Sequence, residues 1–157
     1  MKKSILICLL AAIFFGRKPK QTVVGTKLDN KSEVAIKGNW TLISVIYPGS
    51  EFIKVTSFDI ADSKCFVGSN WKFISNNNKG DMALNSASCT GFASPITWYI
   101  NKEGNFVMKI INETKSKKVL DGYILKISNL TETTFQLIDT ANVGGKTIEV
   151  VYQFQRN

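Results

Sequence analysis

The chain has 157 residues, the size of one domain, and 44% of them are hydrophobic, which excludes a chain that is disordered by composition. The formal net charge is +8, but the basic residues form no stripe on one element and accompany no recognition motif, so we expect no nucleic acid partner. Histidine is absent, which removes the commonest general base and the commonest metal ligand. The composition therefore predicts a protein that is not an enzyme and holds no metal and no cofactor.

The N-terminus has the layout of an export signal. Lys2 and Lys3 form a positive region, and the apolar run 5–15 that follows ends at the small residue Gly16. Eleven apolar residues are typical of a signal peptide and too few to cross a bilayer, which needs about 20. We therefore predict that residues 1–16 are a signal peptide. A buried first helix of the domain is the alternative for the same run.

The polar segment 17–35 follows the predicted signal. It contains Pro19 and Gly25 and shows no regular hydrophobic period, which is typical of a flexible tether. The sequence predicts at most a helical turn near residues 32–36. The folded domain is then expected to span residues 36–157.

From Trp40 onward, short β-type segments are separated by turn residues. In most of them, apolar residues alternate with polar ones, as in the last segment, where Tyr152 and Phe154 oppose Gln153 and Gln155. Consecutive strands joined by short loops indicate an antiparallel meander. The sequence therefore predicts an all-β fold, an eight-stranded antiparallel up-and-down β-barrel. The expected strands are 40–47, 52–60, 71–75, 81–84, 96–100, 106–111, 120–128, 134–139 and 146–155.

Two cysteines remain once the predicted signal, which contains Cys8, is set aside. Cys65 and Cys89 form an even pair, and an even pair in an exported chain indicates a disulfide. Two separate buried thiols are the alternative. Two cysteines without histidine give too few soft ligands for a metal site.

The two ends of the predicted domain carry residues that fit together. Gly38-Asn39-Trp40 opens the first strand, and Arg156 shares the apolar face of the last strand because it lies two residues after Phe154. A charged group on an apolar face needs a partner, and the face of an indole can stabilise a guanidinium.

This combination resembles the lipocalin family. There, a Gly-x-Trp on the first strand lies at the closed end of the barrel, and an arginine near the end of the last strand packs across the tryptophan. Gly38, Trp40 and Arg156 match these positions, and the resemblance covers residues 36–157. It implies that the three residues are structural, close the base of the barrel and contact no ligand.

More narrowly, the chain resembles the lipocalin-like envelope proteins common in Bacteroidetes. The likeness is carried by residues 64–71, the Asn-rich loop 76–80, Cys89 and the ending 150–154. It implies an exported protein of the periplasm or the outer membrane, with peripheral or lipid-anchored membrane association among the relatives. Arg17 stands where such relatives have the cysteine that is lipidated, so we do not expect a lipid anchor at that position.

The apolar faces of the expected strands carry aromatic residues that are candidates for lining a ligand cavity, because such cavities are mostly apolar. These residues are Phe73, Trp98, Phe106, Tyr123, Phe135 and Tyr152. The alternative for each is a place in a barrel core filled by side chains. Tyr123 and Tyr152 are the favoured ligand residues, because a buried phenol needs a hydrogen-bond partner.

Three functions remain open from the sequence. The first is a binding module that holds a small hydrophobic molecule in a cavity open at the end away from Trp40 and Arg156. The second is a structural or protein-interaction module with a filled barrel and an exposed apolar patch. The third is an enzyme with a cysteine nucleophile, which requires Cys65 and Cys89 to be unpaired. The sequence specifies neither the ligand nor the oligomeric state.

Overall fold

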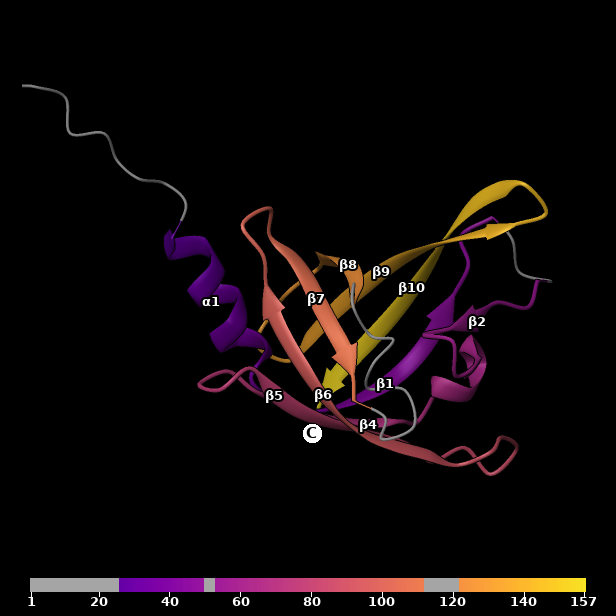
Figure 1. Cartoon of the computed structure of the whole chain (residues 1–157), viewed down its shortest axis with the longest axis horizontal. Coiled ribbons are helices and arrows are strands. Elements are labelled where there is room, and N and C mark those ends of the chain that lie inside the picture. Colours follow the sequence, from indigo (N-terminus) through magenta and orange to yellow (C-terminus); the bar gives the residue numbers. More distant parts are fainter. Residues whose placement is uncertain (1–25, 50–52, 112–121) are drawn as a thin grey trace, which may run out of the picture.

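The structure is a computed structural model and describes residues 26–49, 53–111 and 122–157. The predicted signal, residues 1–16, lies outside the described residues, and so do residue 52 and residues 120–121 of two predicted strands. The described chain forms the helix α1 (Thr26–Ile36), the 3-10 helix η1 (Ser63–Phe66) and ten strands (Figure 1). The strands are β1 (Gly38–Ile46), β2 (Thr56–Ser57), β3 (Ala61–Asp62), β4 (Asn70–Ile74), β5 (Lys79–Leu84), β6 (Phe92–Ile100), β7 (Asn105–Ile110), β8 (Tyr123–Ser128), β9 (Thr134–Val143) and β10 (Lys146–Arg156).

Eight of these strands close into a barrel in the order β1-β10-β9-β8-β7-β6-β5-β4. Every neighbouring pair is antiparallel, and β1 pairs with both β10 and β4, so the first and last strands of the domain seal the barrel. The period-two pattern turns one face of each strand inward, and closure leaves no exposed sheet edge. The prediction of an eight-stranded antiparallel up-and-down β-barrel is confirmed.

The helix α1 is longer than the sequence predicts. Only a turn at residues 32–36 is expected inside an irregular tether, whereas the helix begins at Thr26. Contacts with the barrel hold its last turns, since the Glu33 carboxylate accepts a hydrogen bond from the backbone N–H of Ile100 at 3.1 Å and Ile36 is fully buried. Such tertiary contacts stabilise a short helix more than local propensity does.

The predicted strand at residues 52–60 is wrong for the residues that the structure describes. Only Thr56–Ser57 are extended there, and they pair with Ala61–Asp62 in a separate two-stranded sheet. Between the two strands, Phe58 and Asp59 have left-handed backbone conformations, with φ of 54° and 52°. The turn reverses the chain inside an apolar run, where the sequence carries no Gly or Pro to signal it.

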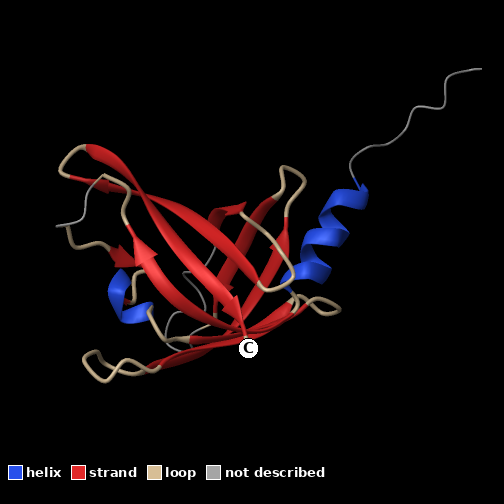
Figure 2. Cartoon of the chain, turned by 180° about the vertical axis from the view of Figure 1, so that it is seen from behind, coloured by secondary structure: helices blue, strands red, loops and turns tan. Residues whose placement is uncertain are grey.

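The two ends of the barrel carry different elements, and we call them the closed end and the open end (Figures 1 and 2). The helix α1, the C-terminus and the β4–β5, β6–β7 and β8–β9 turns lie at the closed end. The β5–β6 and β9–β10 loops lie at the open end, together with β2, β3 and η1. We call residues 53–66 the lid, and we call the part of the barrel interior that faces them the mouth.

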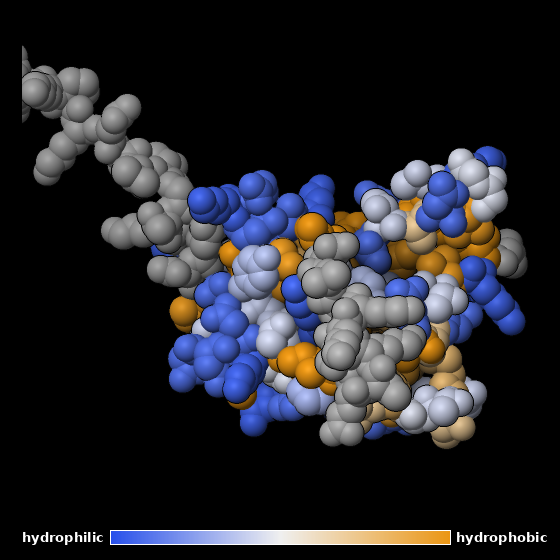
Figure 3. All heavy atoms as spheres, viewed as in Figure 1, coloured by the Kyte–Doolittle hydropathy of each residue, from blue (hydrophilic) through white to orange (hydrophobic). Residues whose placement is uncertain are grey.

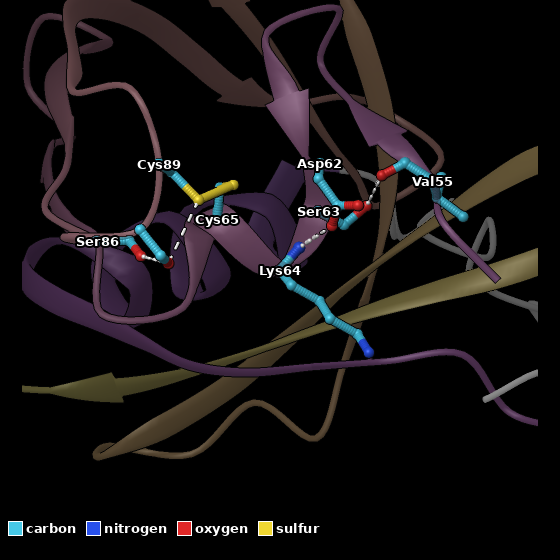
Figure 4. Close-up of a disulfide and its surroundings, with 8 residues drawn as sticks. Val55, Asp62, Ser63, Lys64, Cys65, Ser86 and Cys89 are labelled. Carbon is cyan, nitrogen blue, oxygen red and sulfur yellow. Dashed lines mark hydrogen bonds between the residues drawn. A yellow bond between two sulfur atoms is a disulfide. The ribbon is translucent and has the colours of Figure 1, made fainter. Parts of the chain in front are cut away.

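A disulfide joins the lid to the barrel. Cys65 in η1 is bonded to Cys89 in the β5–β6 loop, with the two Cα atoms 5.8 Å apart (Figure 4). In the same lid segment, the carboxylate of Asp62 accepts a hydrogen bond from the backbone N–H of Lys64 at 2.9 Å and so caps the start of η1. The predicted pairing of the two cysteines is therefore present, and it holds the C-terminal part of the lid at the open end.

Removing this disulfide should destabilise the domain. The two cysteines are 24 residues apart, and a loop of this length corresponds to about 3–4 kcal/mol in the chain-entropy description of cross-links. We expect the double variant Cys65→Ser/Cys89→Ser to lose about that much free energy of unfolding in urea titrations. Dithiothreitol should lower the stability of the wild type and leave the variant unchanged. Equal stability of the two proteins without reductant would contradict the prediction.

Candidate functional site

Arg156 is the centre of the closed end. Its guanidinium carbon lies 4.2 Å from the centroid of the Trp40 ring. Its N–H groups donate hydrogen bonds to the carbonyls of Ala35 at 2.6 Å, Lys37 at 2.9 Å and Glu132 at 2.6 Å. The last carbonyls of a helix have no partner within it, and a cation there interacts favourably with the helix dipole. Arg156 therefore fixes α1 to the base of the barrel.

Gly38 and Trp40 complete this closure. The indole N–H of Trp40 donates a hydrogen bond to the carbonyl of Ile36 at 2.6 Å. Gly38 has φ of 132°, and a Cβ atom at this position would lie 2.5 Å from Nη1 of Arg156. Glycine therefore fits here where a larger residue would clash. The three residues that the family resemblance implied to be structural lie together at the end of the barrel away from the lid.

Four of the six predicted ligand residues lie in tightly packed surroundings. The Phe73 ring centroid is 5.3 Å from that of Trp98 and 5.6 Å from that of Phe106, and Phe135 stacks on Phe154 at 4.6 Å. The four predicted residues are each at most 1% exposed. Aromatic rings at these distances make favourable contacts with one another and leave little space between them. The structure places these four side chains in the core of the barrel.

The other two predicted ligand residues, Tyr123 and Tyr152, face the lid. The ring of Phe58 lies between them, stacked on Tyr152 at a centroid distance of 5.3 Å and edge-on to Tyr123 at 5.1 Å. On either side of Phe58, the Ser57 hydroxyl is hydrogen-bonded to the Tyr152 hydroxyl, and a carboxylate oxygen of Asp59 accepts a hydrogen bond from the Tyr123 hydroxyl at 3.4 Å. Three consecutive residues thus hold the lid against the barrel.

The turn that carries Phe58 is unfavourable for this residue type. The backbone N–H of Ile60 donates a hydrogen bond to the Ser57 carbonyl at 3.0 Å, and both central residues, Phe58 and Asp59, have positive φ. Turns of this kind favour Asn and Gly, and the left-handed conformation costs an ordinary residue about 1–2 kcal/mol. The Phe58 side chain is only 6% exposed. Burial of its ring in the mouth therefore offsets the strain of the turn.

Hydroxyl groups of the lid are linked to Tyr152 by consecutive hydrogen bonds. Because each hydroxyl has one proton to donate, the donor and the acceptor of each bond can be assigned. Ser63 Oγ donates to the carbonyl of Val55 at 2.7 Å, so its single proton is used. Ser57 must therefore donate to Ser63 across their 2.6 Å contact, and Tyr152 must donate to Ser57. No described residue donates a hydrogen bond to the Tyr152 oxygen in this arrangement.

Tyr47 brings an unpaired polar atom into the interior. Val45 pairs with Tyr152, whose ring points inward, so Tyr47, two residues further along, lies on the same inner face. Its side chain is 4% exposed, and its hydroxyl has no hydrogen-bond partner among the described residues. A buried polar group without a partner costs about 1–3 kcal/mol. The hydroxyl is thus free to bind a polar group that enters the mouth.

Asp139 places a carboxyl group on the same inner face. It follows the inward-facing Leu137 by two residues on β9 and pairs with the buried Val150 of β10. Burial raises the pKa of Asp139, and a hydrogen bond from the Thr140 backbone N–H, 2.8 Å long, opposes this effect. That bond is to Oδ1, and no described residue donates to Oδ2.

Asp139 lies diagonally beside Tyr152, because Tyr152 pairs with Leu137 and Asp139 is two residues further along the same face of β9. Burial and the negative charges of Asp59 and Asp139 raise the pKa of Tyr123 to about 12. Burial also raises the pKa of Tyr152, to which Asp139 and Tyr47 contribute. An apolar barrel therefore ends, beneath the lid, in a group of phenols and one carboxyl group.

Three residues of the mouth are missing from the sequence prediction. Asp139 could have been found, because alternation puts it on the face of Phe135 and Leu137, where a charged residue is unusual. Tyr47 ends a predicted strand, but nothing in the sequence shows that its hydroxyl is unpaired. Phe58 carries no signal, since its place depends on a turn that the sequence does not indicate.

The structure gives less support to a catalytic site or a metal site. The disulfide leaves Cys65 and Cys89 without a thiolate, so the cysteine nucleophile that an enzyme would need is not present in this state. Among the described residues, no three Cys, Asp or Glu side chains form a group that could hold a metal ion. Neither is any helix in the described part of the chain long and apolar enough to cross a membrane.

A hollow lies on the outer surface of the barrel. It has a volume of about 460 Å³ and lies over β1, β4, β5 and β6, with Ala83, Ala93 and Pro95 among its lining residues. It is open to solvent and contains no buried polar group without a partner, so it offers less for recognition than the mouth does.

Residues 36–137, more than half of the chain, match the family model of the lipocalin-like domain. The chain therefore belongs to the lipocalin-like domain family, as its Gly-x-Trp and Arg156 predict.

Among solved structures it is similar to bovine odorant-binding protein. The protein from nasal mucosa is 15% identical with a TM-score of 0.45, covering 82% of this chain and 74% of that one. Its complex with a selenium-containing odorant is 12% identical with a TM-score of 0.46, covering 80% and 72%. The chain has no significant match among curated proteins.

Truncating Arg156 should destabilise the closed end. Arg156→Ala leaves three carbonyls without their donor and exposes the Trp40 face, so we expect the free energy of unfolding to fall by about 2–4 kcal/mol. Arg156→Lys should recover only part of this loss, because an ammonium cannot reproduce the planar set of donors. The control is Gln155→Ala, an exposed neighbour, which should change stability by less than about 0.5 kcal/mol. An Arg156→Ala protein as stable as this control would contradict the prediction.

Asp139 should make stability depend on pH. Because its folded-state pKa is raised above the ordinary 3.8, its contribution is fully present below that value and is lost as pH rises through the folded pKa. We expect Asp139→Asn to have a higher melting temperature than the wild type at pH 7 and no such advantage at pH 3. Melting curves across this range test the sign, with Glu149→Gln on the outer face as the control. A wild type that gains stability over Asp139→Asn on going from pH 3 to pH 7 would show that the carboxylate is stabilised by the fold.

Proposed function

We propose that this protein binds a small hydrophobic ligand in the mouth of its barrel and catalyses no reaction. The observation that carries the proposal is the unpaired, buried hydroxyl of Tyr47 among apolar walls. Binding pockets for small molecules combine apolar walls with a few polar groups that orient the ligand. The mouth has this composition, whereas the interior around Phe73 and Phe135 is occupied by packed rings.

The ligand needs the space that Phe58 occupies. The Phe58 ring lies between Tyr123 and Tyr152 and is attached to a strained turn. Displacing it exchanges one aromatic group in the mouth for another and releases the backbone strain, and both offset part of the cost of breaking the ring contacts and the hydrogen bonds of Ser57 and Asp59. The disulfide keeps Cys65 in place, so only the part of the lid before it has to move.

We also propose that the protein is exported. The support is the sequence of residues 1–16, in which two lysines precede an apolar run of signal-peptide length. In an envelope compartment the disulfide is stable. The mass of the protein purified from its native cells tests this proposal, since export predicts a chain that lacks the first residues.

A second candidate function is an interaction module with a filled barrel. The outer faces of β6, β7 and β8 carry a row of apolar residues in register, in which Tyr99 is 45% exposed and Ile124 is 59% exposed, whereas Val107 between them is only 4% exposed. Exposed apolar rows of this kind are typical of contact surfaces between proteins. Under this alternative the mouth stays closed and Phe58 is a permanent part of the core.

A fluorescent apolar probe distinguishes the two functions. We expect N-phenyl-1-naphthylamine to bind the wild type saturably at one site, and Phe58→Ala to bind it at least fivefold more tightly because the competing ring is gone. Phe135→Ala, or Phe135→Leu if that variant does not fold, removes an aromatic ring from the packed core and should not tighten binding. Absence of saturable binding in both the wild type and Phe58→Ala would overturn the binding function and favour the interaction module.

A further inference from the structure

The charge of the barrel interior restricts the class of ligand. On the inner faces of the described strands, the charged residues are Arg156, at the closed end, Asp139, in the mouth, and Lys146, at the tip of the β9–β10 hairpin. Lys146 is exposed and lies four residues from Val150, the partner of Asp139, which is about 13 Å along an extended strand. Of these three, the group nearest to a ligand in the mouth is the carboxyl of Asp139, and Asp59 of the lid, which accepts a hydrogen bond from Tyr123, adds a second carboxyl group there.

The polar groups around this carboxyl are acceptors. Displacing Phe58 moves the adjoining Ser57 away from Tyr152, which frees the Tyr152 hydroxyl to accept as well as donate, and Oδ2 of Asp139 receives no hydrogen bond from the described residues. The Tyr47 hydroxyl is unpaired and can accept as well as donate. A ligand that brings hydrogen-bond donors satisfies these groups, whereas a carboxylate ligand would face Asp139 with the same charge.

The aromatic groups of the mouth favour a ring with a positive charge beside it. Phe58 shows that a phenyl ring fits between Tyr123 and Tyr152, and Asp139 lies diagonally beside Tyr152 on the neighbouring strand. The faces of tyrosine rings attract cations, and a carboxylate next to them adds a direct ion pair. The space and the charge required are those of an arylalkylamine.

We propose that the mouth selects a small primary amine that carries an aromatic ring, with the ring in the place of Phe58 and the ammonium group on Asp139. This proposal rests on the proposed ligand-binding function and specifies its ligand class. The ammonium donates to the Asp139 carboxylate and to the oxygens of Tyr152 and Tyr47. The net charge of +8 disfavours cations at long range, but a charge more than about 10 Å away is screened at 0.1 M salt, so the local carboxylate determines selection.

Three probes of the same shape and different charge test the proposal: 2-phenylethylamine, 2-phenylethanol and phenylacetate. In NMR titrations at 0.1 M salt and pH 7, we expect the amine to bind the wild type at least tenfold more tightly than the alcohol, and phenylacetate to bind most weakly. Asp139→Asn should weaken the amine to the level of the alcohol and leave the alcohol unchanged. The matched control is Glu149→Gln, which removes the same charge from the exposed outer face of β10 and should change no affinity by more than twofold.

The outcomes separate the two proposals. Equal affinity for the three probes, tighter binding of phenylacetate, or an amine preference that survives in Asp139→Asn would overturn the ligand class and leave the binding function standing. Phe58→Ala should tighten all three probes by a similar factor, which provides a measurable signal if the wild type binds weakly. Absence of binding by both the wild type and Phe58→Ala would overturn the binding function itself.

Discussion

The contact between Arg156 and Trp40 is the interaction on which the closed end of this barrel depends. The guanidinium lies over the indole ring and donates to the carbonyls of Ala35, Lys37 and Glu132, so one side chain joins the helix, the first strand and the β8–β9 turn. Arg156 and Trp40 are also directly paired across the seam between β10 and β1. A barrel without sheet edges requires this seam, because either strand would otherwise expose its unpaired backbone groups.

Because one end of the barrel is closed, we propose the other end as the site of binding. The interior near Phe73, Phe106 and Phe135 is filled by aromatic rings in contact. The mouth differs in kind, because it contains phenols and a carboxyl group and is covered by a lid of irregular structure. One end of the barrel is tightly packed, and the other is hydrogen-bonded and contains a strained turn. This distribution is expected when recognition takes place at one end of a stable scaffold.

The lid connects stability with recognition. Phe58 is buried against Tyr123 and Tyr152 while its backbone has a positive φ, so its side chain favours the closed lid and its main chain opposes it. A ligand shifts this equilibrium by as much as it favours the open lid over the closed one. The disulfide at Cys65 limits the movement to the preceding residues, which keeps the lid close to the mouth when it opens.

The sequence by itself determined the barrel, because alternation of apolar and polar residues is a local pattern that each strand carries alone. It also predicted the pairing of Cys65 with Cys89 and the structural trio of Gly38, Trp40 and Arg156, whose residue types are rare enough to be informative. The tertiary structure alone decided which aromatic residues face the mouth, since Phe135 and Tyr152 have the same pattern and differ only in their height within the barrel. It also decided the positions of Phe58 and of the unpaired Tyr47 hydroxyl, which depend on contacts between segments about 65 to 105 residues apart that no local pattern records.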